Sequence, residues 1–127
     1  MITVYGIDDC LNPVKAQMSD VIHRCMVSVL QMPQDKRAHR FVPLERSNFY
    51  YPGGRSDKYT VIEINMIAGR KEATKKALIK SLFEAFRQQL AIEPVDVEIT
   101  INEQPAHCWG FRGMTGDEAT LNYRIEV

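Results

Sequence analysis

The sequence feature that most constrains the fold is an internal repeat, because one order of strand, helix and strand occurs twice. At an offset of 60 residues, the apolar positions of the first predicted helix coincide with those of the second. The matched pairs are Met18/Leu78, Ile22/Leu82, Cys25/Ala85, Met26/Phe86, Leu30/Leu90 and Met32/Ile92. At an offset of 58 residues the strands that follow also match, in the pairs Phe41/Ile99, Glu45/Glu103 and Tyr51/Trp109. Matches at a fixed spacing indicate duplication of one β-α-β unit.

In the first unit, residues 2–6 are β-branched and aromatic, which predicts a strand. Asn12 and Pro13 are typical of a helix start, with Asn as cap and Pro at the first position. Apolar residues at helical spacing from 14 to 30 predict a helix, which Pro33 ends. An extended strand is expected over 39–45, followed by a turn at 52–54.

The second unit repeats this order. A strand is expected over 59–67, a helix from roughly 71 to 90, and an alternating strand over 96–103. Leu121, Tyr123, Ile125 and Val127 alternate with polar residues. This alternation predicts an additional strand at 120–127 that closes a sheet edge or pairs with a neighbouring chain.

Two β-α-β units with right-handed crossovers combine into one sheet. We therefore predict an α+β fold with a four-stranded, ferredoxin-like sheet and both helices on one face. The chain is interpreted as a single domain, 1–127, with repeats at about 1–54 and 59–113 and a C-terminal strand at 120–127. The face without helices should carry mostly polar side chains, namely Glu63, Asn65, Glu98, Thr100 and Asn102.

Composition limits the function classes. The 16 basic and 16 acidic residues give no net charge, so nucleic acid is not expected as a partner. Three cysteines without CxxC spacing, and three histidines in different elements, indicate neither a disulfide framework nor a metal site. No apolar run is long enough for a membrane span. A cytoplasmic protein without a cofactor is the expectation.

Two arginines are candidates for anion binding. Arg70 precedes a helix start, where a cation opposes the helix dipole. It either holds a carboxylate together with free backbone N–H groups, or is a solvated residue that pairs with Glu72 or Glu63. Arg40, inside a predicted strand, has the same two interpretations.

The other reactive residues are less informative. Ser56 and Asp57, beside Arg55, more often stabilise a loop than catalyse a reaction. His107 and Cys108 are adjacent, so in extended chain they point to opposite sides and do not form a catalytic pair. Trp109 and Phe111 either wall an apolar pocket or plug the core.

The second half resembles the tautomerase superfamily. The resemblance rests on 60–72 with its Gly69-Arg70 pair, on 75–79, and on 97–109 followed by Gly110-Phe111-Arg112-Gly113. This order is similar to the 4-oxalocrotonate tautomerase unit of strand, Gly-Arg, helix, strand and aromatic-Gly hairpin. The first half resembles it more loosely, as in the fused, two-unit branch with its MIF-like fold.

The resemblance implies a homotrimer with active sites between subunits and an N-terminal proline as acid or base in keto-enol tautomerisation. It also implies arginines that hold a substrate carboxylate and an aromatic wall. The equivalent residues in this chain are Arg70 and Arg40 for the arginines, and Trp109 and its first-unit counterpart Tyr51 for the wall. Arg55 and Arg112 are further candidates for substrate binding.

The proline position of the family falls on Ile2 in the first unit and on Thr60 in the second. A large residue at position 2 is expected to keep Met1, whose primary amine is displaced by roughly 3.5 Å along the chain. Its reference pKa, about 7.7–8.0, still suits a base near neutral pH. Met1 and Ile2 are therefore the candidate catalytic residues of a site in which the proline is substituted.

The leading hypothesis is a tautomerase-like isomerase that binds a small carboxylate or keto acid, with weak or altered activity. The alternative is a non-catalytic binding or assembly protein on the same fold. An RNA-binding sheet is disfavoured because Glu63, Asn65, Glu98 and Thr100 stand where base-stacking aromatics would be needed.

Overall fold

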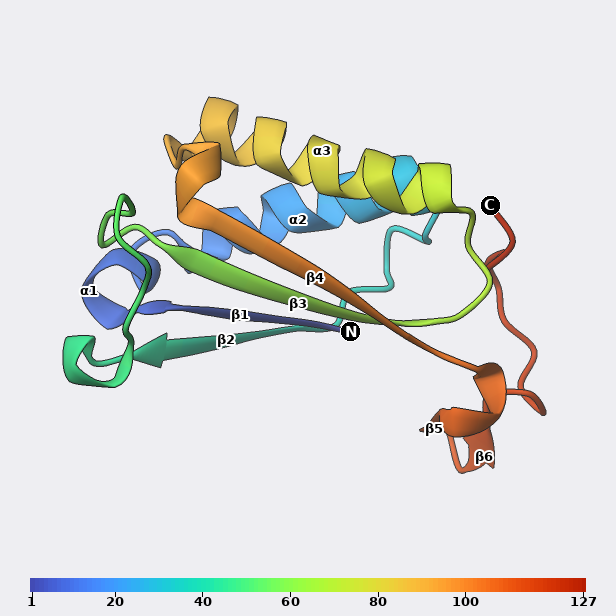
Figure 1. Ribbon diagram of the computed structural model, residues 1–127. Helices are drawn as coiled ribbons and strands as arrows, with labels where there is room; N and C mark the ends of the chain where they lie inside the picture. The colour runs from blue at the N-terminus through green and yellow to red at the C-terminus, as the bar shows by residue number, and fades with distance from the viewer.

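The computed structural model describes residues 1–127, in which two β-α-β units share one sheet (Figure 1). The first unit consists of β1 (Ile2–Ile7), α2 (Lys15–Leu30) and β2 (His39–Leu44). The second consists of β3 (Thr60–Ile67), α3 (Glu72–Leu90) and β4 (Val97–Gln104). Short elements lie between and after them: α1 (Asp8–Leu11), three 3₁₀ turns (Arg46–Asn48, Pro94–Asp96, Ala106–Cys108), β5 (Gly110–Phe111) and β6 (Met114–Thr115).

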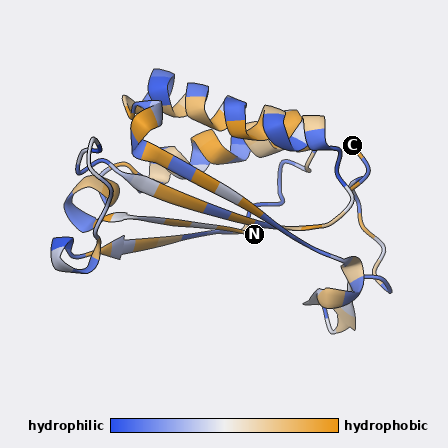
Figure 2. Ribbon diagram, in the orientation of Figure 1, coloured by the Kyte–Doolittle hydropathy of each residue, from blue (hydrophilic) through white to orange (hydrophobic).

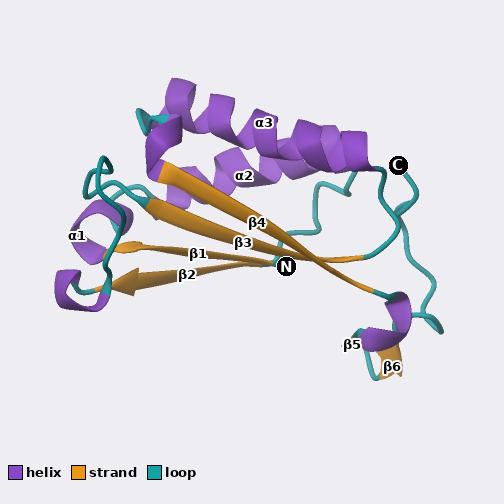
Figure 3. Cartoon of the chain, in the orientation of Figure 1, coloured by secondary structure: helices purple, strands orange, loops and turns teal.

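The strand order is β2-β1-β3-β4, and each unit contributes one parallel pair. The two units meet where β1 and β3 run antiparallel, with Ile2 opposite Ile64 and Gly6 opposite Thr60. Both long helices cover the same face of the sheet (Figure 3). The predicted α+β, ferredoxin-like fold is therefore confirmed. Because β1 and β3 are antiparallel, the start of each strand lies beside the end of the other.

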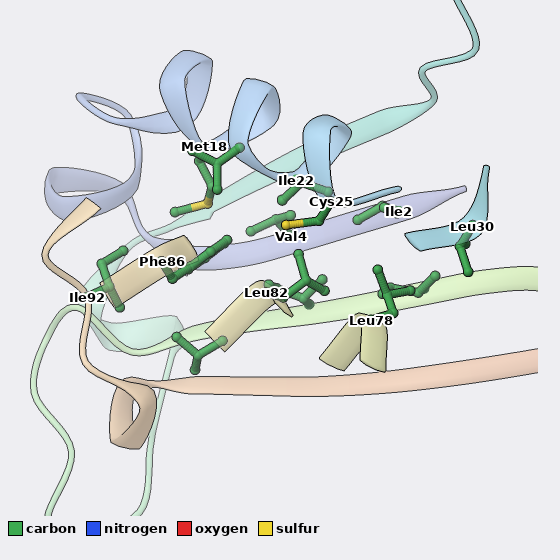
Figure 4. Packing of buried hydrophobic residues seen from close by; sticks show 14 of the residues in the cluster. Ile2, Val4, Met18, Ile22, Cys25, Leu30, Leu78, Leu82, Phe86 and Ile92 are labelled. Carbon is green, nitrogen blue, oxygen red and sulfur yellow. The ribbon is translucent and has the colours of Figure 1, made fainter. Parts of the chain in front are cut away.

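The core lies between the sheet and the two helices. Figure 2 shows that the apolar side of each helix faces the sheet, as the helical spacing of apolar residues requires. Close packing joins Met18 and Ile22 of α2 with Leu82 and Phe86 of α3 above the central strand residue Val4 (Figure 4). All five are fully buried, so truncating Leu82 to Ala should cost about 2–5 kcal/mol of unfolding free energy.

The opposite face of the sheet carries the polar side chains that strand alternation predicts. Glu98, Thr100 and Asn102 are exposed on β4, and Glu63 and Asn65 are half-buried on β3. The register places Tyr5 of β1 and Val61 of β3 side by side on this open face. The open face is thus polar with an apolar strip across it, and no helix of the chain covers it.

The first helix start differs from the sequence prediction. The chain first forms the short helix α1, and Asn12 is its C-cap rather than the N-cap of the long helix. Asp8 and Asp9 favour α1 because carboxylates stabilise the first turn of a helix. Leu11, at the end of α1, is buried, and its Cβ would lie only 3.2 Å from a Cβ at Gly6.

The segment after β4 leaves the sheet and folds back as the β5–β6 hairpin (Figure 1). Arg112 and Gly113, with φ of 54° and 76°, form its turn. Positive φ at both turn positions matches the twist of a two-residue hairpin.

Residues 120–127 form no strand and pair with no strand of the chain, so the predicted closure of a sheet edge is wrong, whereas pairing with a neighbouring chain stays a prediction. They run as an extended loop to the start of α3 (Figure 3). There the Val127 carbonyl accepts hydrogen bonds from Lys71 N at 3.1 Å and Thr74 Oγ1 at 2.9 Å. The alternation instead turns Tyr123 and Ile125 toward the protein, half-buried. None of the helices combines the length and apolar character that crossing a membrane demands.

Candidate functional site

A cavity of about 350 Å³ lies where β1 starts beside the end of β3. Its size is within the range of small-molecule sites. The lining comes from the N-terminus, α2, the link to β2, the end of β3, the β5 region and the C-terminal segment. The polar or charged lining residues are His23, Lys36, His39, Asn65, Arg70, Arg112 and Tyr123, together with the Met1 amine. No aspartate or glutamate lines the cavity, so it favours an anion.

The amine of Met1 stands at this cavity. It donates a hydrogen bond to the Asn65 carbonyl at 2.8 Å, because the antiparallel pairing brings the end of β3 beside the start of β1. Burial lowers the pKa of the Met1 amine below its ordinary value of 8.0, and the charges of Arg40, Arg70 and Lys36 lower it further. The neutral form, which can accept a proton, is therefore more populated at a given pH than in an ordinary terminal amine.

Arg70 is buried, with only 7% of its surface exposed, and it pairs with no carboxylate. Its Nη1 donates to the Ile67 carbonyl at 3.3 Å, and its Nη2 contacts Met32 Sδ at 3.8 Å. Nε has no partner. The predicted alternative, a solvated arginine paired with Glu72 or Glu63, is thus wrong, and Glu72 instead pairs with Lys76 at 2.7 Å.

A buried guanidinium without an ion pair is costly, and burial lowers the pKa of Arg70, an effect that the charges of Tyr123 and Glu103 oppose only in part. A bound carboxylate would supply the missing charge and accept from the fork of N–H donors. Among the predicted arginines, Arg70 is therefore the one whose environment in the folded chain most needs an anion.

The far wall of the cavity comes from the segment after β4. Trp109 and Phe111 contribute aromatic surface, and Trp109 Nε1 donates to the Gln104 carbonyl at 3.3 Å. Arg112 adds a cation at the rim; its guanidinium lies 5.3 Å from the Phe111 ring centre and donates to the Thr120 carbonyl at 3.2 Å.

Two residues of irregular segments complete the mouth of the cavity. Lys36, in the link before β2, places Nζ 5.0 Å from the ring centre of Tyr123 in the C-terminal segment. This cation–π contact joins segments far apart in the sequence. Sequence reasoning missed both residues, because nothing local marks a lysine in a charged link or a tyrosine in an alternating segment as cavity-lining.

Two histidines line the inner side, with ring centres 6.3 Å apart. His23 Nε2 lies 2.7 Å from the Gln34 carbonyl, and His39 Nδ1 lies 2.8 Å from Ser19 Oγ. Burial, followed by the charge of Arg37, lowers the pKa of His39 to about 4. His39 is therefore neutral at pH 7.

The structure brings five of the predicted site residues together at this cavity: Met1, Ile2, Arg70, Trp109 and Arg112. Arg40 does not line it, since its exposed side chain stands on the open face beside Thr3 and acts on the Met1 amine only through its charge. Tyr51 and Arg55 belong to the loop before β3, at the other end of the sheet. Tyr51 packs 5.7 Å from the Tyr59 ring, and Arg55 donates to the Gly53 carbonyl at 3.1 Å.

That other end holds a second cavity, of about 280 Å³, beside the start of β3. It is lined by Thr60, the second expected proline position, and by Cys10 and Tyr59. Thr60 has no free amine, and its hydroxyl donates to the Lys58 carbonyl at 2.8 Å. The charged lining residues are Asp9, Asp57 and Lys58, so this cavity lacks the cationic character of the first.

Comparisons with known proteins agree with this geometry. Residues 36–112 match the family described as "Tautomerase enzyme". The 2-hydroxymuconate tautomerase of Pseudomonas putida is 36% identical over 56 residues, which cover 44% of this chain and 89% of that protein. The "Probable tautomerase YusQ" of Bacillus subtilis (strain 168) is 25% identical over 100 residues, 75% of this chain and 79% of that protein.

Solved structures show the same architecture. The R7 fused 4-OT wild type asymmetric trimer superposes with a TM-score of 0.81 at 27% identity, covering 92% of this chain and 96% of that one. The family match covers more than half of the residues and includes β3, α3, β4 and the aromatic wall of the cavity. The chain belongs to the tautomerase family.

Proposed function

We propose that the chain binds a small carboxylate or keto acid in the cavity beside Met1 and interconverts its keto and enol forms. The observation that carries this proposal is that one cavity holds both a partly buried terminal amine and a buried arginine that forms no ion pair. A 2-oxo acid matches this pair, because its carboxylate can bind the arginine and the acidic C–H beside its carbonyl can give a proton to the amine.

In the proposed reaction, Arg70 holds the carboxylate, and Trp109 forms the apolar wall against which the substrate lies. The neutral Met1 amine takes a proton from C3, and the C–H electrons form the C2=C3 bond while the carbonyl π electrons move to oxygen. The ammonium then gives that proton to the oxygen, which yields the enol and the neutral amine. In the reverse direction the amine takes the enol O–H proton and delivers it to C3, which regenerates the ketone. The low-dielectric wall strengthens the attraction between Arg70 and the substrate anion.

Ile2 stands where the family's proline is expected, and this substitution should alter the rate. The amine is primary and is displaced along the chain, and a misplacement of about 1 Å can cost on the order of a hundredfold in rate. We therefore expect weak activity in the natural chain. Assembly as a homotrimer is part of the proposal, supported by the trimeric fused 4-OT relative. Arg40, Tyr51 and Arg55 stay candidate contacts to substrate in such an assembly.

The test is an enolisation assay with a phenylpyruvate-type substrate, read by loss of enol absorbance and by deuterium exchange at C3. The wild type is compared with Arg70→Met and with Ile2→Pro, prepared without Met1 so that the chain begins with the free proline amine. Arg87→Met is the matched control, because Arg87 is an exposed arginine on α3 that pairs with Glu84 at 2.6 Å. We expect activity above buffer in the wild type, a gain in Ile2→Pro, a loss in Arg70→Met and no change in Arg87→Met.

Ile2 is buried and its N–H donates to the Ala38 carbonyl at 2.9 Å, so folding of Ile2→Pro is checked by thermal melting. Absence of exchange in both the wild type and a folded Ile2→Pro, together with no carboxylate binding, would refute the enzymatic function. Carboxylate binding without exchange in either would favour the non-catalytic binding protein.

A further inference from the structure

The Met1 amine differs chemically from a proline amine, because it is primary. Its one hydrogen bond, to the Asn65 carbonyl, uses one N–H when the amine is neutral. A second N–H and the lone pair are then left without a partner in the chain. A primary amine that keeps two N–H groups can lose both and form a neutral imine with a carbonyl compound, which a secondary amine cannot do.

The surroundings favour a neutral, nucleophilic amine. Burial and three nearby cations, Arg40, Arg70 and Lys36, oppose its protonation, and no lining residue is acidic. Desolvation and a neighbouring cationic group are the conditions under which protein amines act as nucleophiles toward carbonyls. The other amine of the cavity, Lys36, makes a cation–π contact with the ring of Tyr123.

We propose that the Met1 amine condenses reversibly with 2-oxo acids to form an imine in this cavity. This inference rests on the proposed function in that both use the Met1 amine and the Arg70 cation. The imine proposal goes beyond the proposed function because it assigns a covalent intermediate and an activity that captures carbonyl compounds. Arg70 selects the ligand, because a 2-oxo acid carries its carboxylate on the carbon next to the reacting carbonyl.

The nitrogen lone pair forms a bond to C2, the carbonyl π electrons move to oxygen, and one proton passes from nitrogen to that oxygen to give a carbinolamine. The C2–O bond then breaks, the second N–H proton leaves with the hydroxyl as water, and the nitrogen electrons form C2=N. No oxidant or reductant takes part, and addition of water reverses the reaction. When the imine is protonated, its N–H can again donate to the Asn65 carbonyl.

The experiment is trapping with borohydride. The full chain is first weighed intact to establish that Met1 carries a free amine. It is then incubated with pyruvate and sodium cyanoborohydride, weighed again and digested for peptide mapping. We expect one adduct whose added mass equals that of pyruvate less one oxygen atom, located on the Met1 peptide and saturating with pyruvate concentration.

Variants and a second carbonyl compound test the selectivity. Arg70→Met should lower the rate of labelling at limiting pyruvate at least tenfold, whereas Arg87→Met should not change it. Acetone, which lacks a carboxylate, should label Met1 far more slowly than pyruvate. Adding Gly-Ser ahead of Met1 moves the terminal amine out of the cavity and should abolish selective labelling.

A blocked or absent Met1 amine would overturn the proposal, as would labelling spread over surface lysines without saturation. The two proposals fail separately. Deuterium exchange at C3 without a Met1 adduct refutes the imine and retains the acid–base function. A selective Met1 adduct without exchange supports the imine and refutes the tautomerase function. Absence of both signals refutes both.

Discussion

At the scale of single residues, Arg70 shows a conflict between stability and binding. The guanidinium is buried with only a backbone carbonyl and a thioether as partners, so its desolvation is poorly compensated. Replacing a poorly compensated buried charge with an apolar residue of similar volume is often neutral or stabilising. A bound anion would supply the charge partner that the folded chain lacks, which is consistent with an anion site.

We therefore expect Arg70→Met to raise the free energy of unfolding, by about 1 kcal/mol, while abolishing carboxylate binding. Urea denaturation measures the first effect. Quenching of Trp109, the one tryptophan of the chain, measures the second, because this side chain lines the cavity. Arg87→Met is the control for both. A variant that loses binding and also loses several kcal/mol of stability would show that Arg70 is a structural residue.

The Met1 amine should set the pH dependence of activity. Because only the neutral amine accepts a proton, the rate should rise with pH through a pKa below 8.0 and then level off. Removing a nearby cation with Arg40→Gln should raise this pKa and move the rising limb to higher pH. Lys80→Gln, on the exposed side of α3, is the matched control. The measurement is kcat/KM between pH 5 and 9. If kcat/KM rises over the same pH range in Arg40→Gln as in the wild type, the Met1 amine is not the titrating group.

His39 should make the fold sensitive to acid. Its pKa is about 4 in the folded chain against 6.5 ordinarily, so between these values the unfolded chain binds a proton that the folded chain does not. Stability should thus fall as pH drops from about 6.5 to about 4, by about 1–3 kcal/mol given partial exposure of the ring. Urea denaturation at pH 7 and pH 5 should show a smaller difference for His39→Gln, whereas the exposed-site control His107→Gln should behave as the wild type.

At the scale of elements, the C-terminal segment depends on a glycine. Gly69 has a φ of 139°, and a Cβ there would lie 3.0 Å from Ile125 Cγ2. Gly69→Ala should therefore strain the backbone and displace the segment that carries Tyr123 to the cavity, at about 1–3 kcal/mol. Gly54 also has a positive φ, of 84°, but no atom lies within 4 Å of a Cβ there, so Gly54→Ala measures the backbone strain alone. Gly53→Ala, which has neither a positive φ nor a close neighbour, should leave stability unchanged.

Thermal melting and pyruvate binding measure the two effects in these glycine variants. We expect Gly69→Ala to weaken binding and to lower stability more than Gly54→Ala does. Equal effects of Gly69→Ala and Gly54→Ala on both quantities would show that the Ile125 contact does not hold the segment.

The elements also show how far sequence reasoning reaches. The regular spacing of apolar residues locates the two long helices and the four strands, because each of these elements buries one face. It does not locate α1, because a helix of four residues is too short for an apolar spacing to repeat. Nor does it show where residues 120–127 lie, because alternation indicates a buried side but not a partner strand. At the site, the resemblance identifies Arg70 and Trp109, whereas Lys36 and Tyr123 join the cavity only through long-range packing.

At the scale of the whole molecule, the antiparallel junction of the two units produces two unlike cavities at opposite ends of one sheet. The start of β1 has a free amine and surrounding cations, and the start of β3 has Thr60 with acidic neighbours. A duplicated unit thus concentrates the proposed chemistry at one end. The uncovered open face and the edge strands β2 and β4 are the surfaces left for assembly.

The proposed homotrimer can be tested on the apolar strip of the open face, which Tyr5 and Val61 form. Val61 lies between Tyr5 and Glu98 in the strand register, half-buried although no helix covers it. If three open faces meet, Val61→Arg inserts a charge into an interface and should release single chains, since an unpaired buried charge is strongly unfavourable. Ser28→Arg, on the exposed side of α2, is the control.

Light scattering after size exclusion should give three times the 14.6 kDa chain mass for the wild type and for Ser28→Arg, and a single-chain mass for Val61→Arg. Circular dichroism establishes that Val61→Arg is folded. If a neighbouring subunit supplies substrate contacts such as Arg40, Tyr51 or Arg55, the enolisation rate should be lower in the single-chain Val61→Arg variant than in the trimeric wild type. A wild type of single-chain mass at micromolar concentration would refute the trimer, and full activity in folded, single-chain Val61→Arg would show that one subunit contains the whole site.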